Sequence, residues 1–307
     1  MIQVNARGFR MLHLPVHRSH RLRSVKHDAT QMRSLPHLPS AHLLALLALS
    51  LATETLAQSP AGLTRTTEEQ PARSVADEAA LLEKGRLSAR RNALARLAAH
   101  ADPEADRVLL AQFERYRARE LPPAIWLDLF EAAAKRDHPK LKALLAEREQ
   151  ALEKSSDRLS RFRECLEGGD GEAGREVFSK KPEAGCIRCH SVNDEGGKIG
   201  PDLTWLRNSM DRVLILESII APNSTIATGF QSASVTLKNG ETLSGVVSHE
   251  SADTVTITSV ADGKKRTVKT ADVAERTPLP SPMPPHFGVV LSKREIRDLV
   301  EFIAAGD

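Results

Sequence analysis

Cysteine is scarce in this sequence: Cys165, Cys186 and Cys189 are the only three among 307 residues. A structural zinc site usually takes four Cys or His ligands in two pairs. A second pair is missing here, because Cys165 stands alone with no histidine near it. A thioredoxin-like redox pair lies next to a βαβ pattern, and none surrounds Cys186. Both of these uses of a C-x-x-C pair are therefore disfavoured.

The sequence contains no apolar run long enough to cross a bilayer. The stretch LLALLALSLA at 43–52 is too short for a transmembrane helix, and Thr55-Leu56-Ala57 follows it as a small-residue cleavage pattern. We therefore predict a leader and secretory signal peptide over 1–57, cleaved before Gln58. An uncleaved N-terminal anchor has the same hydropathy and stays the alternative. A start at Met32 would give a signal of more ordinary length.

A strong charge of either sign is absent from the rest of the chain. Seven of the 43 basic and two of the 40 acidic side chains lie in residues 1–57, so the remainder has a net charge of −2. Nucleic-acid-binding domains usually carry a basic patch. We therefore predict no nucleic-acid partner, and membrane association only if the signal segment stays uncleaved.

The five residues Cys186-Ile187-Arg188-Cys189-His190 form a C-x-x-C-H run. This run is the attachment signature of a c-type haem. Two thiols one helical turn apart can each add to a haem vinyl group, and the adjoining imidazole can bind the iron from the proximal side. The motif predicts one covalent haem c, with its iron, held by Cys186, Cys189 and His190.

The chain after the signal peptide divides by composition. Residues 58–74 read as a linker, and 75–167 as a helical module with apolar side chains at helical spacing and prolines where helices should begin. The module resembles a degenerate helical-repeat array, although no sequence period is evident. Residues 168–307 form the haem domain, and the predicted fold class is mainly α.

Within the haem domain the sequence predicts two terminal helices and a β insertion. The first helix surrounds Gly174–Phe178. The last follows the capping box that Ser292 and Glu295 form. Between them, over about 229–276, alternating segments joined at Asn239-Gly240 and Asp262-Gly263 predict hairpins that make a small inserted sheet or barrel.

These features resemble class I cytochromes c. In that class the first and last helices cross beside the haem, and Gly174, Phe178 and Phe302 match the residues at their contact. The class also has a proline whose carbonyl orients the proximal histidine, and Pro201 matches it. Groups around the haem propionates often follow this proline, which makes Trp205 and Arg207 candidates here.

The distal iron ligand has few candidates, because a chain that begins at Gln58 contains only Met210 and Met283. Met283 is favoured, since the prolines around it leave little backbone entropy to lose on ligation. Met210, at the head of a helix, is better explained by packing. His286 is the rival to Met283, and bis-His ligation should lower the potential that a thioether raises.

The segment from about Cys165 to Ile303 closely resembles the haem-binding C-terminal domain of Planctomycetes and Verrucomicrobia cytochrome-like proteins. In larger relatives this domain follows helical repeats and a propeller similar to quinoprotein sugar dehydrogenases, and the propeller is absent here. The resemblance implies an electron acceptor separated from its dehydrogenase. It rests on the C-x-x-C-H run and on Gly168-Gly169-Asp170, Gly200-Pro201-Asp202-Leu203, Glu217-Ser218-Ile219, Pro222-Asn223, Gly229-Phe230, Met283-Pro284 and Leu291-Ser292.

The leading prediction is an exported, periplasmic mono-haem cytochrome that carries one electron between a dehydrogenase, its donor, and a downstream acceptor. Such a protein has no substrate chemistry of its own and is not an enzyme. The alternatives are a haem peroxidase or gas-binding sensor with an open distal site, and a scaffold whose haem is structural. Cys165 is either a free or intermolecular thiol or a buried small side chain.

Overall fold

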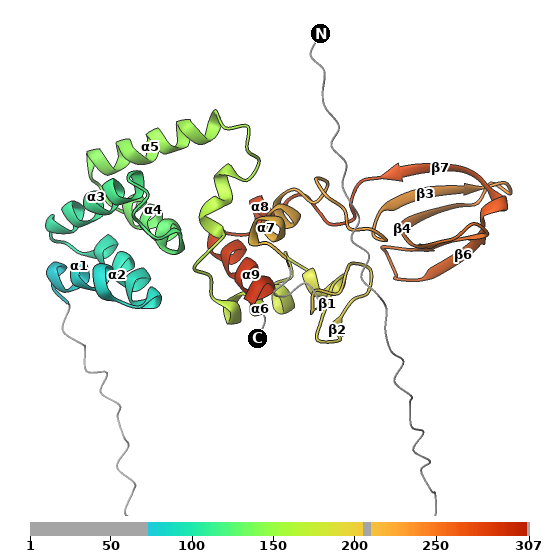
Figure 1. The fold of residues 1–307 in the computed structure, drawn as a ribbon, viewed down its shortest axis with the longest axis horizontal. Helices are drawn as coiled ribbons and strands as arrows, with labels where there is room; N and C mark the ends of the chain where they lie inside the picture. Colours follow the sequence, from blue (N-terminus) through green and yellow to red (C-terminus); the bar gives the residue numbers. More distant parts are fainter. Residues whose placement is uncertain (1–72, 205–209, 306–307) are drawn as a thin grey trace, which may run out of the picture. The chain divides into compact units, whose positions relative to one another are not determined.

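The computed structural model describes residues 73–204 and 210–305. The predicted leader, the signal peptide and the linker up to residue 72 lie outside this part, as do Trp205 and Arg207. No helix in the described part is long and apolar enough to cross a membrane. Figure 1 shows a first group of helices, a second group of helices and a sheet.

The first group of helices spans the predicted helical module. Pro103 directly precedes one helix and Pro139 begins another, as the sequence predicts, and the Asp102 carboxylate accepts a hydrogen bond from Glu104 N–H at 2.8 Å. Fully buried leucines, Leu94 and Leu109 among them, form its core. The resemblance to a helical-repeat array remains a prediction. The elements are α1 (Val75–Lys84), α2 (Leu87–Ala99), α3 (Glu104–Arg117), the 3-10 helix η1 (Pro123–Ile125), α4 (Trp126–Ala134) and α5 (Pro139–Glu153).

The second group contains the haem motif and has its own core. This core also includes Leu159 and Cys165, which precede the predicted boundary at residue 168. The short strands β1 and β2 pair antiparallel directly after the motif. The elements are the 3-10 helix η2 (Ser160–Cys165), α6 (Gly171–Lys180), the 3-10 helix η3 (Cys186–Arg188), β1 (Ser191–Val192), β2 (Glu195–Gly196), α7 (Arg212–Ile220), α8 (Phe287–Val290) and α9 (Lys293–Ala305).

Helices α6 and α9 lie side by side, which confirms the predicted crossing of the first and last helices. Gly174 allows this approach, because a Cβ there would clash with the backbone oxygen of Asp298. The rings of Phe178 and Phe302 pack 5.5 Å apart at the same contact. The capping box is also present, since Ser292 N–H donates to the Glu295 carboxylate and Glu295 N–H to the Ser292 hydroxyl.

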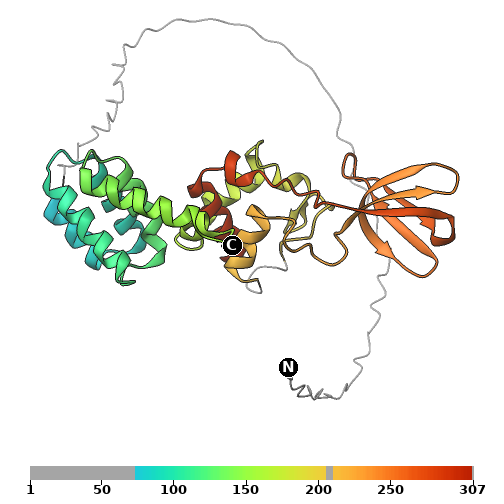
Figure 2. The ribbon, with the colours of Figure 1, turned by 90° about the horizontal axis from the view of Figure 1, so that it is seen from above.

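The β insertion is an antiparallel sheet with strand order β6-β5-β4-β3-β7. Gly240 and Gly263 take positive φ angles of 87° and 68° at the two predicted hairpin turns. The order leaves β6 and β7 as edge strands, so the barrel alternative is not confirmed. Figure 2 shows that the chain enters and leaves the sheet at one end. The strands are β3 (Ser232–Leu237), β4 (Thr242–Glu250), β5 (Thr254–Thr258), β6 (Lys265–Lys269) and β7 (Val273–Leu279), with the 3-10 helix η5 (Thr270–Asp272) before the last.

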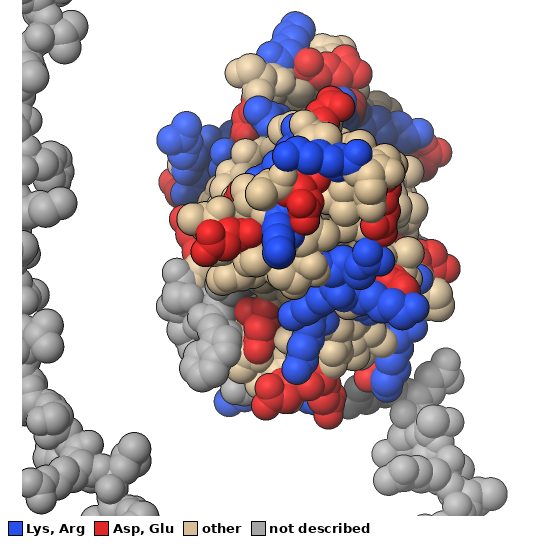
Figure 3. Space-filling view, turned by 90° about the vertical axis from the view of Figure 1, so that its right-hand side faces the viewer, with Lys and Arg blue, Asp and Glu red and all other residues tan. Residues whose placement is uncertain are grey.

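The two edge strands differ in how they avoid further pairing. On β6 the side chains of Lys265, Arg266 and Lys269 are exposed, and Lys and Arg gather on part of the face seen in Figure 3. Such charges oppose edge-to-edge association. Strand β7 carries Pro278, which a central strand would exclude. The sequence prediction ended the insertion at about residue 276, whereas β7 continues to Leu279.

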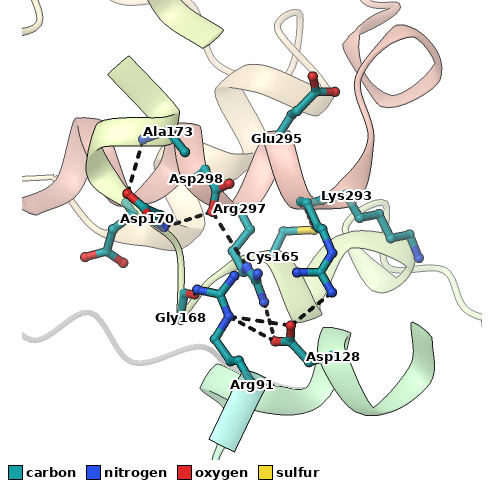
Figure 4. A network of polar contacts seen from close by, with 12 residues as sticks. Arg91, Asp128, Cys165, Gly168, Asp170, Ala173, Lys293, Glu295, Arg297 and Asp298 are labelled. Atoms are coloured by element: carbon teal, nitrogen blue, oxygen red, sulfur yellow. Dashed lines mark hydrogen bonds and ion pairs between the residues drawn. The ribbon is translucent and has the colours of Figure 1, made fainter. Parts of the chain in front are cut away.

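A buried ion pair joins the first group of helices to α9 (Figure 4). Arg297, with a side chain 0% exposed, donates Nη1–H to Asp128 Oδ2 on α4 at 2.7 Å. Arg294 and Arg91 also reach the Asp128 carboxylate, at 3.1 and 3.4 Å. Arg91 donates in addition to the Gly168 carbonyl at 2.8 Å. Asp128 on α4 therefore neutralises the completely buried guanidinium of Arg297 on α9.

We expect Asp128→Ala to lower the free energy of unfolding by about 3–5 kcal/mol, because it removes the anion that is hydrogen-bonded to the buried Arg297 and leaves only Asp298, 3.9 Å away. Chemical denaturation measures this. Asp137, whose side chain is 95% exposed in its pair with Lys142, provides the control, and Asp137→Ala should cost at most about 1 kcal/mol. An Asp128→Ala variant no less stable than Asp137→Ala would contradict the assignment.

Candidate functional site

The 3-10 turn η3 brings the two cysteines of the motif onto one side of the chain. Cys189 N–H and His190 N–H both donate to the Cys186 carbonyl, at 3.1 and 2.9 Å. In a 3-10 turn the side chains at i and i+3 lie nearly in line, so the Cys186 and Cys189 side chains share a face. Gly185 leads into the turn with a left-handed φ of 56°, which favours glycine.

The environment of Cys186 disfavours a redox-active pair. Burial raises the pKa of this thiol to about 11. A thioredoxin-like motif works through a thiolate whose pKa is lowered, which is the opposite shift. Among the described residues there is also no group of three or more His, Cys, Asp or Glu side chains placed to hold a metal ion.

The imidazole of His190 is oriented by one backbone carbonyl. Its Nδ1 lies 3.0 Å from the oxygen of Pro201, which confirms the contact that the sequence predicted. Burial lowers the pKa of His190, opposed by this hydrogen bond. A neutral ring that donates Nδ1–H to Pro201 leaves the Nε2 lone pair available to a metal. The tautomer that an iron ligand needs is therefore set by the fold.

Backbone hydrogen bonds join the segment after the motif to the motif itself. Gly197 N–H donates to the Ile187 carbonyl and Gly200 N–H to the Cys189 carbonyl, both at 2.8 Å. Leu203 N–H donates to the Ser191 carbonyl at the same distance. These bonds fix the position of Pro201 relative to His190.

The packing of the His190 ring on Gly200 shows whether the site fits a haem. A Cβ at Gly200 would lie 2.6 Å from Cε1 of the His190 ring, closer than real side chains approach. The ring therefore packs directly on the backbone of Gly200, with no space for another atom. Together with the two aligned thiols, this arrangement fits a covalent haem c. The sequence prediction named Gly200 only as part of the segment Gly200-Pro201-Asp202-Leu203 and gave it no role at the site, although its place before Pro201 was the available signal.

The structure distinguishes among the candidates for the second iron ligand. Met283 and Met210 are both partly buried against the same core as Cys186 and Ile187. His286 is exposed, and its carbonyl accepts the N–H groups of Val289 and Val290 as α8 begins. A thioether near the motif is thus available from either methionine, whereas the His286 side chain faces solvent.

Two further side chains have structural partners. Arg212, the first residue of α7, binds the Glu301 carboxylate with Nη1 and Nη2 at 2.8 and 3.0 Å. Cys165 is fully buried, and its thiol donates to the Lys293 carbonyl at 3.3 Å. Burial raises the pKa of Cys165 to about 12. Cys165 is therefore the buried side chain of the two predicted alternatives.

Residues 171–307 match the model of the family described as Cytochrome c. No curated protein matches the chain. The match covers η3, the Pro201 segment, the sheet and α9, and it leaves the first group of helices outside. This part of the chain is therefore a cytochrome c-like, haem-binding domain whose cofactor is covalently bound haem c with its iron.

We expect Gly200→Ala to displace the His190 ring, because the new methyl group and the Pro201 hydrogen bond cannot both be accommodated. Overpacking of this kind costs about 1–3 kcal/mol. Denaturation of the haem-loaded protein measures the loss, and the ratio of haem to protein absorbance measures incomplete loading. Gly171→Ala is the control, since a Cβ there meets no atom within 4 Å. Equal stability and loading in the two variants would contradict the packing of His190 on Gly200.

Proposed function

We propose that this chain, whose residues 171–307 form a cytochrome c domain, is an exported mono-haem protein that carries one electron. Its donor would be a periplasmic dehydrogenase of the quinoprotein type, and its acceptor a downstream redox protein. The observation that carries the proposal is the His190 ring, fixed by the Pro201 carbonyl beside the turn that carries Cys186 and Cys189. A cytochrome c domain implies a redox protein partner.

The residues of the motif have separate tasks in this proposal. The Sγ–H bonds of Cys186 and Cys189 would each add across a vinyl C=C bond, which forms two thioethers and loses no atom. The Nε2 of His190 would bind the iron, while Pro201 keeps the proton on Nδ1. The haem supplies the one-electron couple. The protein supplies the ligands, the burial of the iron and the surface that a partner contacts.

Met283 is the distal ligand that we favour. It lies partly buried against the core that also contacts Cys186, whereas His286 is exposed. Met210 precedes α7 directly after the segment 205–209, which the structure leaves undescribed. A thioether ligand raises the reduction potential relative to a second imidazole, which suits an acceptor of electrons from a dehydrogenase.

Export is part of the proposal. The predicted signal peptide would place the chain where thiols are joined to haem, on the outer side of the bacterial membrane. The apolar run at 43–52 and the small-residue pattern Thr55-Leu56-Ala57 after it are the features that support this part of the proposal. The domain match gives no support to the alternative of a haem peroxidase or gas sensor with an open distal site.

We expect Met283→Ala to abolish the weak far-red sulfur-to-iron band of the oxidised protein and to lower its midpoint potential. Absorbance spectra and a redox titration of the exported, haem-loaded protein measure both. Met210→Ala is the matched control, since Met210 packs against the same core, and it should keep the band.

Carbon monoxide separates a closed from an open distal site. The reduced wild-type protein should bind carbon monoxide poorly at neutral pH, and Met283→Ala should bind it rapidly. If Met210→Ala lost the far-red band and Met283→Ala kept it, Met210 would be assigned as the distal ligand instead. Rapid, stoichiometric binding by the wild type would contradict the electron-carrier proposal.

A further inference from the structure

We infer that Asn223 is a positioning residue that fixes the loop carrying Met283, and this inference rests on the proposed ligation by Met283. The loop connects the end of β7 to the start of α8 over residues 280–286. Its sequence is Pro-Ser-Pro-Met-Pro-Pro-His. Four of its first six residues are prolines, which have no N–H to donate. Only Ser281 and Met283 offer backbone donors in residues 280–285.

Both of these donors are used in a relay that begins at Asn223. Ser281 N–H donates to Asn223 Oδ1 at 2.8 Å. Met283 N–H donates to the hydroxyl oxygen of Ser281 at 3.2 Å. One amide side chain from a different part of the sequence therefore fixes the backbone of the methionine loop at this end.

The segment that carries Asn223 is itself held in place. Ser224 N–H donates to the Ala221 carbonyl at 2.8 Å and closes a turn directly after α7. Pro222 is buried in this turn. The hydroxyl of Ser224 accepts a hydrogen bond from Arg158 at 2.6 Å. Asn223 is thus exposed but stands on a fixed turn at the end of a helix of the haem domain.

The other end of the loop is fixed by packing. Phe287 is 4% exposed, and a Cβ at Gly288 would lie 2.7 Å from Cζ of Phe162. Helix α8 therefore lies tightly against η2. Met283 is held between this packed end and the Asn223 relay, with prolines on both sides.

The relay lies where the chain enters and leaves the sheet. Asn223 and Ser281 are 58 residues apart, and the whole sheet lies between them. The chain enters and leaves the sheet at the same end (Figure 2). The Asn223–Ser281 hydrogen bond joins the segment that enters the sheet to the segment that leaves it.

The experiment measures how firmly the sulfur holds the iron. In the oxidised, haem-loaded protein, added imidazole competes with the methionine sulfur for the iron. The dissociation constant of imidazole therefore rises with the stability of the closed loop. Loss of one hydrogen bond shifts such an equilibrium by about fivefold. Asn223→Ala should therefore lower the imidazole dissociation constant by about fivefold and weaken the far-red band. Ser281→Ala, which removes only the acceptor for Met283 N–H, should act in the same direction.

Conservative variants test the hydrogen bond itself. Asn223→Asp and Ser281→Thr keep an acceptor oxygen, so both should stay near the wild-type imidazole affinity. Asn239→Ala is the matched control, because Asn239 is an exposed turn residue whose Oδ1 accepts Glu241 N–H at 3.0 Å within the sheet. This variant should leave the band and the imidazole affinity unchanged.

The outcomes separate the positioning role from the ligand assignment. Suppose that Met283→Ala loses the far-red band while Asn223→Ala keeps the wild-type band and imidazole affinity. This result would overturn the role of Asn223 and leave Met283 as the ligand. The role of Asn223 would also be overturned if the imidazole dissociation constant of Asn223→Asp were as low as that of Asn223→Ala. A far-red band retained in Met283→Ala would contradict the ligand and, with it, the relay.

Discussion

The hydrogen bond between His190 and the Pro201 carbonyl is the constraint on which the site depends. It decides which ring nitrogen carries the proton, and thereby which nitrogen is left for iron. The contact exists because backbone bonds hold the Gly200 segment against the motif and because Gly200 has no side chain. A local sequence signature thus becomes a metal-binding geometry only through a loop that begins several residues later.

The distal side is built differently from the proximal side. His190 and Pro201 are close in sequence, whereas Met283 follows a sheet that the chain inserts after α7. Loop-closure entropy rises only slowly with loop length, so an insertion of this size is tolerated where its ends are brought together. In this chain the pairing of β3 with β7, which sets Ser232 opposite Leu279, brings them together. The Asn223–Ser281 hydrogen bond joins the segments just outside this pair, and the prolines around Met283 restrict the backbone of the loop.

The sequence predicts the parts of the molecule that depend on local patterns. The C-x-x-C-H run, the capping box at Ser292 and the Asn239-Gly240 hairpin each need only a few adjacent residues, and the structure contains the corresponding turn, helix and hairpin. The full extent of β7 was not predicted, because an edge strand with one paired neighbour requires little alternation and tolerates Pro278.

Contacts between distant residues could not be predicted in the same way. No sequence pattern near Asp128 indicates that its partner is Arg297, 169 positions away. Asn223 lies in a segment that the family resemblance includes, but its contact with Ser281 requires the folded insertion. Likewise, Cys165 could be assigned to the core only when its burial was known.

The central claim is that two neighbouring thiols of this chain bind haem covalently beside a fixed imidazole. The most direct measurement is extraction of the exported protein with acidified acetone after full denaturation, in a host that has cytochrome c maturation machinery. The account predicts that the colour stays with the polypeptide, and that Cys186→Ala/Cys189→Ala releases it. A wild-type polypeptide left colourless by the same treatment would contradict the account.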